Sequence, residues 1–363
     1  MSAPRVSEFN APTRVVAGTG VVAARLAGEL DALGTGVVAV VADAGIAAAG
    51  LLDPILASVP GVALPVCGLI GPDPAPASAE QAALAAIGQG ATAVLGIGGG
   101  SALGAAKAVA IRLRNEGDLH DWVGRDRVPG PPAPCIAIPT TAGSGSEVSN
   151  TLVLHQPGLE RMVAIIARGC EPDVALLDGE MLRSLPRRPM LEAAFDALSH
   201  ALEAIWSTGA NSFSDALALA ATQMIFDALV PALERDTEAM QMLMEASAIA
   251  NLACGSSQLA LVHAFTSSPQ IHLPHGYQNA VLLPHVAAFN RGSVTPAAAA
   301  WIDRLPELYA SVGFEATFAV DDATAAELLA AALRHDLRQN NRRSAGEAEL
   351  REILTAAGAQ PPA

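Results

Sequence analysis

The stretch Ala-Val-Leu-Gly-Ile-Gly-Gly-Gly-Ser-Ala-Leu-Gly-Ala-Ala-Lys at residues 93–107 passes from an apolar run, through a glycine turn, into an alanine-rich run. This pattern predicts a buried strand at 93–97 followed by a helix. Glycines let the backbone approach a pyrophosphate, and the first N–H groups of a helix supply donors and a positive dipole end. Candidate phosphate contacts are therefore Gly98, Gly99, Gly100 and Ser101. A tight strand-to-helix connection without a ligand is the alternative.

The same alternation extends along the first half of the chain. Between residues 14 and 182, strand-like runs alternate with alanine-rich stretches, which predicts βα units and a mostly parallel sheet. The expected strands are 36–42, 61–65, 93–97, 135–139 and 174–177. Long segments with helical spacing follow at 190–207, 212–234 and 237–254. We therefore expect an α/β dinucleotide-binding domain over residues 1–185 and an all-helical domain over 186–363, with Pro-Arg-Arg-Pro at 186–189 as a hinge.

Composition narrows the class of protein. The 363 residues are 51% hydrophobic, enough for two domain cores, and the net charge of -15 argues against a nucleic-acid or anionic-membrane partner. Prolines interrupt the apolar segment at 54–72, and the N-terminus lacks the basic start of a signal peptide, so a cytoplasmic protein is expected. The four cysteines are widely spaced, which favours free thiols over disulfides or a zinc knuckle.

Two further segments strengthen the dinucleotide interpretation. Asp43 follows the expected strand 36–42, where a carboxylate could bind an adenosine ribose and repel a 2′-phosphate. A solvated turn aspartate is the alternative reading. Residues 139–147 read Pro-Thr-Thr-Ala-Gly-Ser-Gly-Ser-Glu after another expected strand. This loop has more hydrogen-bond donors than a simple turn needs, so we expect it to contact a ligand.

A metal site is indicated in the helical half. Asp196 and His200 are four residues apart and share one face of a predicted helix, so they can bind one cation. The segment 246–290 contains no Asp, Glu, Lys or Arg but holds His263, His272, His275 and His285. Any one of these imidazoles could be a hydrogen-bonded core residue. One aspartate with three histidines would give Fe²⁺ or Zn²⁺ four protein ligands and leave room for a substrate.

The order of these motifs resembles that of iron-containing alcohol dehydrogenases. The match runs from about residue 12 to 290 through the glycine turn, the 139–147 loop, Asp-Ala-Leu-Ser-His-Ala-Leu-Glu at 196–203 and Pro-His-Gly at 274–276, and Asn-Asn-Arg at 340–342 is a weaker match. The resemblance implies a dehydroquinate-synthase-like fold, a homodimer and NAD(H) rather than NADP(H). By this resemblance, the metal ligands are Asp196, His200, His263 and His275. The cofactor pyrophosphate binds at residues 98–101, and its nicotinamide side contacts Thr140, Thr141 and Ser144. Asp43 is the carboxylate that favours NAD.

Four positions depart from the family pattern. Gly104 replaces an aspartate, as in the maleylacetate reductase branch, Met162 stands where a lysine is usual, and Gly179 replaces a proline. Members commonly carry His-x-x-x-His before Pro-His-Gly. In this sequence Ser267 stands in place of the second histidine, and the loop to His275 is two residues shorter.

The resulting functional hypothesis is a metal-dependent NAD(H)-linked oxidoreductase that interconverts an alcohol and a small aldehyde or ketone, including carbonyl substrates that bear a phosphonate or carboxylate. Gly104 suggests one alternative, a metal-independent maleylacetate-reductase-like enzyme. Ser267 and Met162 suggest another, a non-catalytic structural subunit. Because a serine is no acid or base near neutral pH, His272 is the candidate proton relay. The alternative is that His272 only packs locally while water and the cofactor ribose pass the proton.

Overall fold

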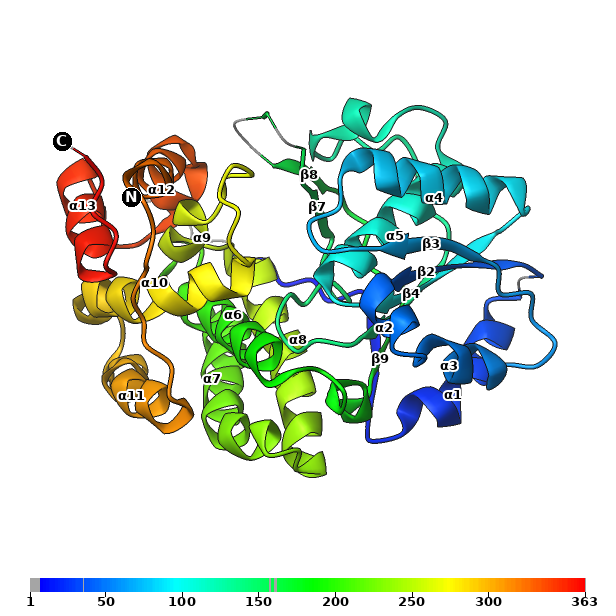
Figure 1. Cartoon of the computed structure of the whole chain (residues 1–363), viewed down its shortest axis with the longest axis horizontal. Helices are drawn as coiled ribbons and strands as arrows, with labels where there is room; N and C mark the ends of the chain where they lie inside the picture. The colour runs from blue at the N-terminus through cyan, green and yellow to red at the C-terminus, as the bar shows by residue number, and fades with distance from the viewer. Residues whose placement is uncertain (1–6, 35, 157, 160–161, 363) are drawn as a thin grey trace.

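The computed structural model describes residues 7–34, 36–156, 158–159 and 162–362. It has an α/β part, which holds the N-terminal half of the chain, and a helical part beside it (Figure 1). This arrangement confirms the expected fold class. All four cysteines are free thiols, as expected.

A six-stranded parallel sheet forms the centre of the α/β part, in the order β1-β9-β6-β4-β2-β3. Its strands are β1 (Arg14–Ala17), β2 (Val38–Asp43), β3 (Val66–Ile70), β4 (Ala93–Gly98), β6 (Cys135–Pro139) and β9 (Val174–Leu177). The helices of this part are α1 (Val21–Ala32), α2 (Ala44–Ala48), α3 (Leu52–Ala57), α4 (Pro76–Gly88) and α5 (Gly100–Arg114). Buried aliphatic side chains of the strands and helices form two apolar cores.

A smaller sheet packs beside α5 in the same part. It consists of β5 (Gly124–Arg125), β8 (Val163–Ile166) and β7 (Thr151–Leu154), with β7 antiparallel to β8. Short 3-10 turns lie at η1 (Leu119–Trp122) and η2 (Gly179–Leu182).

The strand order of the sheet reverses direction at the pair of strands β2 and β4. From β2 the chain continues outward to β3, whereas β4 lies on the opposite side of β2 and leads toward β6. In open α/β sheets, ligands bind outside the carboxyl ends of the strands at such a reversal. Ala42 is in register with Ile97, so Asp43 and Gly98 lie at this edge next to each other.

The helical part is a bundle built on three long helices. These are α6 (Arg187–Trp206), α7 (Ser212–Leu233) and α8 (Thr237–Ser257), and the remaining elements are α9 (Leu261–Phe265), α10 (His275–Asn290), η3 (Arg291–Ser293), α11 (Pro296–Val312), α12 (Asp322–Arg334), η4 (Asp336–Asn340) and α13 (Glu347–Ala356). By length and composition alone α7 could cross a membrane. It packs against α6 and α8, with Ala218, Ile225 and Leu229 buried, and is thus a core helix of the bundle.

Most predicted elements agree with the structure, but two differ. The strand expected at 61–65 is wrong: this segment contributes one bridge, and β3 begins at Val66. Pro65 does not end the strand pairing, because at this edge position only its carbonyl is needed, and that carbonyl accepts the Val40 N–H at 2.9 Å. The expected hinge at 186–189 is mostly helix, because Pro186 precedes α6 and Pro189 lies in its first turn, where a missing N–H costs little.

Candidate metal centre and cofactor site

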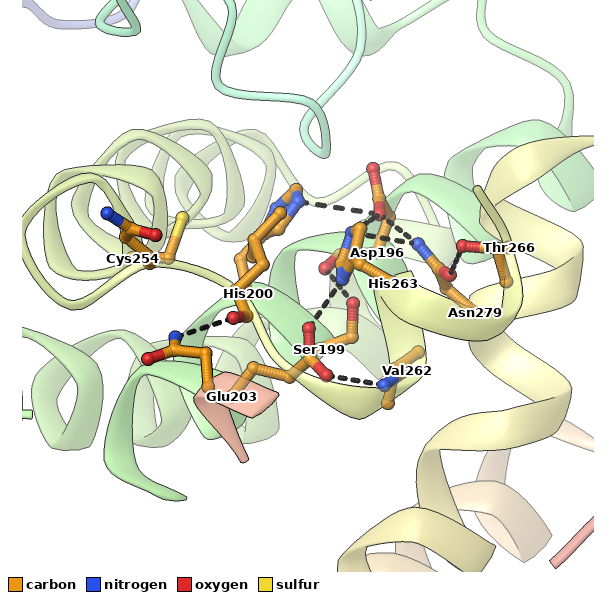
Figure 2. Close-up of polar contacts among 12 residues, drawn as sticks. Asp196, Ser199, His200, Glu203, Cys254, Val262, His263, Thr266 and Asn279 are labelled. Atoms are coloured by element: carbon orange, nitrogen blue, oxygen red, sulfur yellow. Dashed lines mark hydrogen bonds and ion pairs between the residues drawn. The ribbon is translucent and has the colours of Figure 1, made fainter. Parts of the chain in front are cut away.

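Four predicted ligand side chains come together in the helical part. Asp196 and His200 lie on α6, one turn apart, while His263 lies on α9 and His275 begins α10. The Nε2 atoms of His200 and His263 are each 3.7 Å from Asp196 Oδ1, and that of His275 is 3.8 Å away. Figure 2 shows Asp196, His200 and His263 facing one another. This grouping has the donor atoms and the spacing that a divalent cation needs.

Hydrogen bonds behind the imidazoles orient two of the rings. His200 Nδ1 lies 3.2 Å from the carbonyl oxygen of Gly143, and His263 Nδ1 lies 2.6 Å from Glu203 Oε2. An Nδ1–H that donates to oxygen leaves the lone pair on Nε2, which is the atom that faces Asp196. The ring orientations therefore fit metal binding through Nε2.

The electrostatics of the site also favour a cation. Burial alone would raise the pKa of Asp196, but His200, His263 and His275 hold it well below its usual range, so the carboxylate stays ionised. Burial would lower the pKa of His263, yet Glu203 and Asp196 raise it to about 9. The surroundings of the cluster thus favour positive charge, which a divalent cation would supply.

Asn279 is a member of the site that the sequence analysis missed. Its Nδ2 lies 2.7 Å from Asp196 Oδ1 and 3.0 Å from His275 Nε2, while its Oδ1 accepts the Thr266 hydroxyl at 3.0 Å. The side chain is fully buried. Its signal in the sequence was the spacing of four from His275, which places both on one face of α10.

The glycine turn lies at the predicted edge of the sheet and excludes side chains. Gly98 has φ +150°, and a Cβ atom there would lie 2.8 Å from the Cβ of Asp43 and 2.7 Å from that of Ala102. Asp43 Oδ1 accepts the N–H groups of Gly45 at 2.8 Å and Ile46 at 3.1 Å, and so caps α2. Asp43 is therefore a helix cap that also stands beside the candidate pyrophosphate site.

The 139–147 loop packs directly on this turn. The Thr140 N–H donates to the Gly98 carbonyl at 3.0 Å. A Cβ at Gly99 would lie 3.2 Å from Thr141 Oγ1, and one at Gly100 would lie 2.8 Å from Ser144 Cβ. The structure therefore brings together the residues that the sequence assigned to the two ends of a dinucleotide.

Lys107, the only lysine in the chain, anchors the end of this loop. Its Nζ donates to the carbonyl oxygens of Ser146 at 2.9 Å, Ser149 at 3.0 Å and Thr151 at 2.5 Å. Burial lowers the pKa of Lys107 to about 8. An ammonium with three carbonyl partners has no donor left for a ligand, so its role here is to hold the loop.

The same loop also reaches the cluster of candidate metal ligands. Besides His200 Nδ1, the Gly143 carbonyl accepts Asn251 Nδ2 at 3.1 Å. Gly145 has φ +59°, and a Cβ there would lie only 1.7 Å from Asn251 Cγ. One loop thus contacts the glycine turn with one end and the His200 ring with the other.

Two family models match the chain, one described as iron-containing alcohol dehydrogenase over residues 12–179 and one as the C-terminal part of that family over residues 190–297. The chain belongs to the iron-containing alcohol dehydrogenase family. This confirms the resemblance drawn from the motifs.

The chain is similar to curated alcohol dehydrogenases over part of its length. The probable alcohol dehydrogenase EutG of Escherichia coli is 38% identical over 193 residues, which cover 52% of this chain and 49% of EutG. The 1-propanol dehydrogenase PduQ of Salmonella typhimurium is 40% identical over 162 residues, or 44% of each chain. The chain thus matches about half the length of these curated relatives.

Solved structures of the family match nearly the whole chain. Iron-containing alcohol dehydrogenase from Thermococcus thioreducens is 26% identical, with a TM-score of 0.86 over 96% of this chain and 99% of its own. A sulfoacetaldehyde reductase from Bifidobacterium kashiwanohense, solved with NAD⁺, is 24% identical, with a TM-score of 0.87 over 98% of this chain and 100% of its own. The second match supports the fold alone.

Two of the departures from the family pattern have a structural reason. The Gly179 N–H donates to the side-chain Oε1 of Gln241 at 2.7 Å, and a Cβ at Gly179 would lie 2.5 Å from the backbone nitrogen of Gln241. A proline could neither donate this bond nor fit against α8. The position of a Cβ at Gly104 is 3.8 Å from the Val153 carbonyl on β7, so a longer, charged side chain would be buried against that strand. Nothing in the structure explains Met162.

The remaining histidines of the uncharged segment differ in their surroundings. His285 is partly buried, and its Nε2 lies 2.8 Å from the Ala316 carbonyl oxygen, so it is a hydrogen-bonded structural residue. Ser267 donates its hydroxyl to the Ala264 carbonyl at 2.8 Å. His272 is exposed, and its imidazole has no hydrogen-bond or ion-pair partner among the described residues. Its proposed relay role stays a prediction.

Proposed function

We propose that this protein is a metal-dependent, NAD(H)-linked oxidoreductase that interconverts an alcohol and a small aldehyde or ketone. The observation that carries the proposal is the 139–147 loop, which joins a glycine turn suited to a pyrophosphate with the cluster of Asp196, His200 and His263, beside which His275 lies. Hydride transfer to a polarised carbonyl requires these two sites to be adjacent.

The metal we propose is Fe²⁺ or Zn²⁺, held by Asp196, His200, His263 and His275. A carboxylate with three imidazoles suits either ion, and the Nε2 orientation set by Gly143 and Glu203 supports this ligand set. When bound, such a cation supplies Lewis-acid polarisation of a carbonyl oxygen. The intact cluster favours this reading over a metal-independent enzyme.

For the cofactor, we propose that the backbone N–H groups of Gly98–Ser101 bind the pyrophosphate and that Thr140, Thr141 and Ser144 position the nicotinamide end. Asp43 would accept hydrogen bonds from the adenosine ribose and repel the 2′-phosphate of NADP(H). The domain boundary would then lie between residues 185 and 186, with a cofactor-binding domain before it and a metal- and substrate-binding domain after it.

Small aldehydes are the proposed substrates. Similar proteins include a 1-propanol dehydrogenase, a methanol dehydrogenase and a sulfoacetaldehyde reductase, so both neutral and anionic small aldehydes belong in the test set. We further propose a cytoplasmic homodimer, on the strength of the family resemblance.

The test is a panel of short aldehydes with NADH or NADPH, run on metal-free protein and after addition of Fe²⁺ or Zn²⁺. We expect NADH oxidation that depends on added metal. Full activity without metal would instead support the maleylacetate-reductase-like alternative, and failure to bind NADH in a fluorescence titration would support a non-catalytic subunit.

A further inference from the structure

The side-chain amide of Asn279 contacts three of the four proposed metal ligands. Its Nδ2 lies 2.7 Å from Asp196 Oδ1, 3.0 Å from His275 Nε2 and 3.2 Å from His263 Nε2. These are the atoms through which the same side chains face one another. Figure 2 shows the amide directed at Asp196, with Thr266 at its other end. The amide nitrogen thus shares its partners with the proposed cation.

The neighbouring groups determine which end of the amide faces the ligands. A carboxylate accepts hydrogen bonds and donates none, so the NH₂ group must face Asp196. The other end, Oδ1, accepts the Thr266 hydroxyl at 3.0 Å. Because an amide nitrogen only donates, its contact with His275 is an N–H that points at the lone pair of Nε2.

The amide and a cation therefore need the same lone pair. The Nε2 atom of His275 can bind a metal or accept this N–H, but not both. A carboxylate oxygen has more than one lone pair, so Asp196 Oδ1 can keep its N–H bond beside a cation. Buried acceptors without a partner cost free energy, and Asn279 supplies that partner to both side chains when no ion is bound.

We propose that Asn279 occupies the ligand lone pairs in place of the cation in the metal-free protein and competes with the cation for His275. This inference rests on the proposed metal site. The amide keeps the ligands satisfied and in position before an ion arrives, and it gives up the contact with His275 when the ion binds. Its N–H bond also stabilises the free carboxylate of Asp196, which lowers the affinity of that oxygen for a cation.

Asn279 and Glu203 therefore act on metal affinity in opposite directions. The Glu203 carboxylate lies behind His263, at 2.6 Å from Nδ1, and a carboxylate in that position makes an imidazole a stronger ligand. The Asn279 amide is a donor on the side that binds the cation. Removal of Glu203 should weaken metal binding, whereas removal of the Asn279 amide should strengthen it.

The main variant is Asn279→Leu, which removes the amide but keeps a side chain of similar shape. Its matched control is Asn290→Leu, because Asn290 is also fully buried on α10. The Nδ2 of Asn290 donates to the Val286 carbonyl and to Asn341 Oδ1, each at 3.1 Å, and neither partner is a candidate ligand. The control therefore reports the general cost of losing a buried amide on this helix.

Two further variants change the amide in other ways. Thr266→Val removes only the hydroxyl that orients the amide, so it is the mildest change. Asn279→Asp keeps the size of the side chain but places a second carboxylate against Asp196. Urea unfolding of the metal-free and the Zn²⁺-saturated protein, together with isothermal titration of the metal-free protein with Zn²⁺, is measured for wild type and every variant.

We expect Asn279→Leu to lose more stability in the metal-free form than in the Zn²⁺-saturated form, and to bind Zn²⁺ about fivefold more tightly, the factor that one hydrogen bond is worth. Thr266→Val should shift both quantities in the same direction by less. Asn279→Asp should bind Zn²⁺ about tenfold more tightly or better, because the cation relieves the repulsion of two carboxylates. Asn290→Leu should lose equal stability in both forms and bind Zn²⁺ like wild type.

Equal loss of stability in the two forms of Asn279→Leu would overturn the proposal, because Asn279 would then be a packing residue. Weaker Zn²⁺ binding in Asn279→Leu or Asn279→Asp would overturn it too, since the amide would then support the bound ion. Thr266→Val decides by the same two readouts if the larger changes prevent folding. A wild type that binds no Zn²⁺ would instead refute the proposed metal site, before any variant is compared.

Discussion

Glu203 Oε2 lies 2.6 Å from His263 Nδ1, and Glu203 Oε1 accepts the Val262 N–H at 2.5 Å. One fully buried carboxylate thus fixes both the ring of a candidate ligand and the backbone at the start of α9 (Figure 2). Because α6 supplies Asp196, His200 and Glu203, a single helix carries two ligands and orients a third.

This relationship predicts that Glu203→Gln weakens metal binding without removing a ligand. An amide can still accept a hydrogen bond but adds no negative charge, so we expect metal affinity to fall about 10- to 100-fold. Isothermal titration of metal-free protein with Zn²⁺ measures the change. Glu234→Gln, at a glutamate whose side chain is 78% exposed, is the control and should bind like wild type. Equal affinities in all three proteins would contradict the proposed role.

Loss of a ligand should have a larger effect. His200→Ala or His275→Ala removes one of four donors and leaves the buried Asp196 charge with less compensation, so tight binding of one cation per chain and nearly all turnover should disappear. Elemental analysis after gel filtration and an NADH oxidation assay measure both. If metal-free wild type were fully active, the metal would have no catalytic role.

Cofactor preference should depend on the charge of Asp43. Asp43→Asn keeps an oxygen that can cap α2 but removes the negative charge, so the preference for NADH over NADPH should narrow while stability stays near wild type. Asp43→Ala should narrow the cofactor preference too, and it should lower the free energy of unfolding by about 1 kcal/mol because the helix cap is lost. The ratio of kcat/KM for the two cofactors, with urea unfolding in parallel, separates these effects. A wild type that strongly prefers NADPH would show that Asp43 does not face the ribose.

The buried carboxyl of Glu147 predicts a pH dependence of stability. Burial raises its pKa from 4.5 to about 7, and its Oε1 has no hydrogen-bond partner among the described residues. The folded state therefore binds more protons than the unfolded state between these values, so the free energy of unfolding falls as pH rises through this window. The loss is on the order of 3 kcal/mol.

Glu147→Gln cannot ionise and should lack this fall. Urea unfolding of wild type and variant at pH 5 and pH 7.5 tests the prediction, and Glu234→Gln again serves as the exposed control. Parallel pH dependence in wild type and Glu147→Gln would show that another group is responsible.

The sequence was informative wherever local chemistry sets the structure. The strands at 93–97 and 135–139 end at residues with turn chemistry, and the spacing of Asp196 and His200 requires a shared helix face, so these features could be predicted without long-range information. The uncharged segment 246–290 indicated that some of its histidines join Asp196 and His200 at a metal, but only the family resemblance selected His263 and His275, because residues far apart in sequence carry no signal of contact.

Features that depend on tertiary packing were missed. The spacing of Asn279 from His275 places the two on one helix face, but the contacts of Asn279 with Asp196 and Thr266 depend on tertiary packing. The short strands β7 and β8 were not predicted, although β7 packs against α5, the helix that follows the glycine turn. The predicted strand at 61–65 precedes the observed β3 because proline usually ends strand pairing. At the sheet edge proline lacks only an N–H donor, and the Pro65 carbonyl still pairs with β2.

The Gly143 carbonyl is the contact through which metal and cofactor can influence each other. It belongs to a loop that packs on the glycine turn, and it also accepts the hydrogen bond that orients His200. A nucleotide that shifts this loop therefore changes how well the imidazole is presented to a cation. Thermodynamic linkage requires the reverse to be equally true: whatever factor NADH applies to the dissociation constant of the metal, the metal applies to that of NADH.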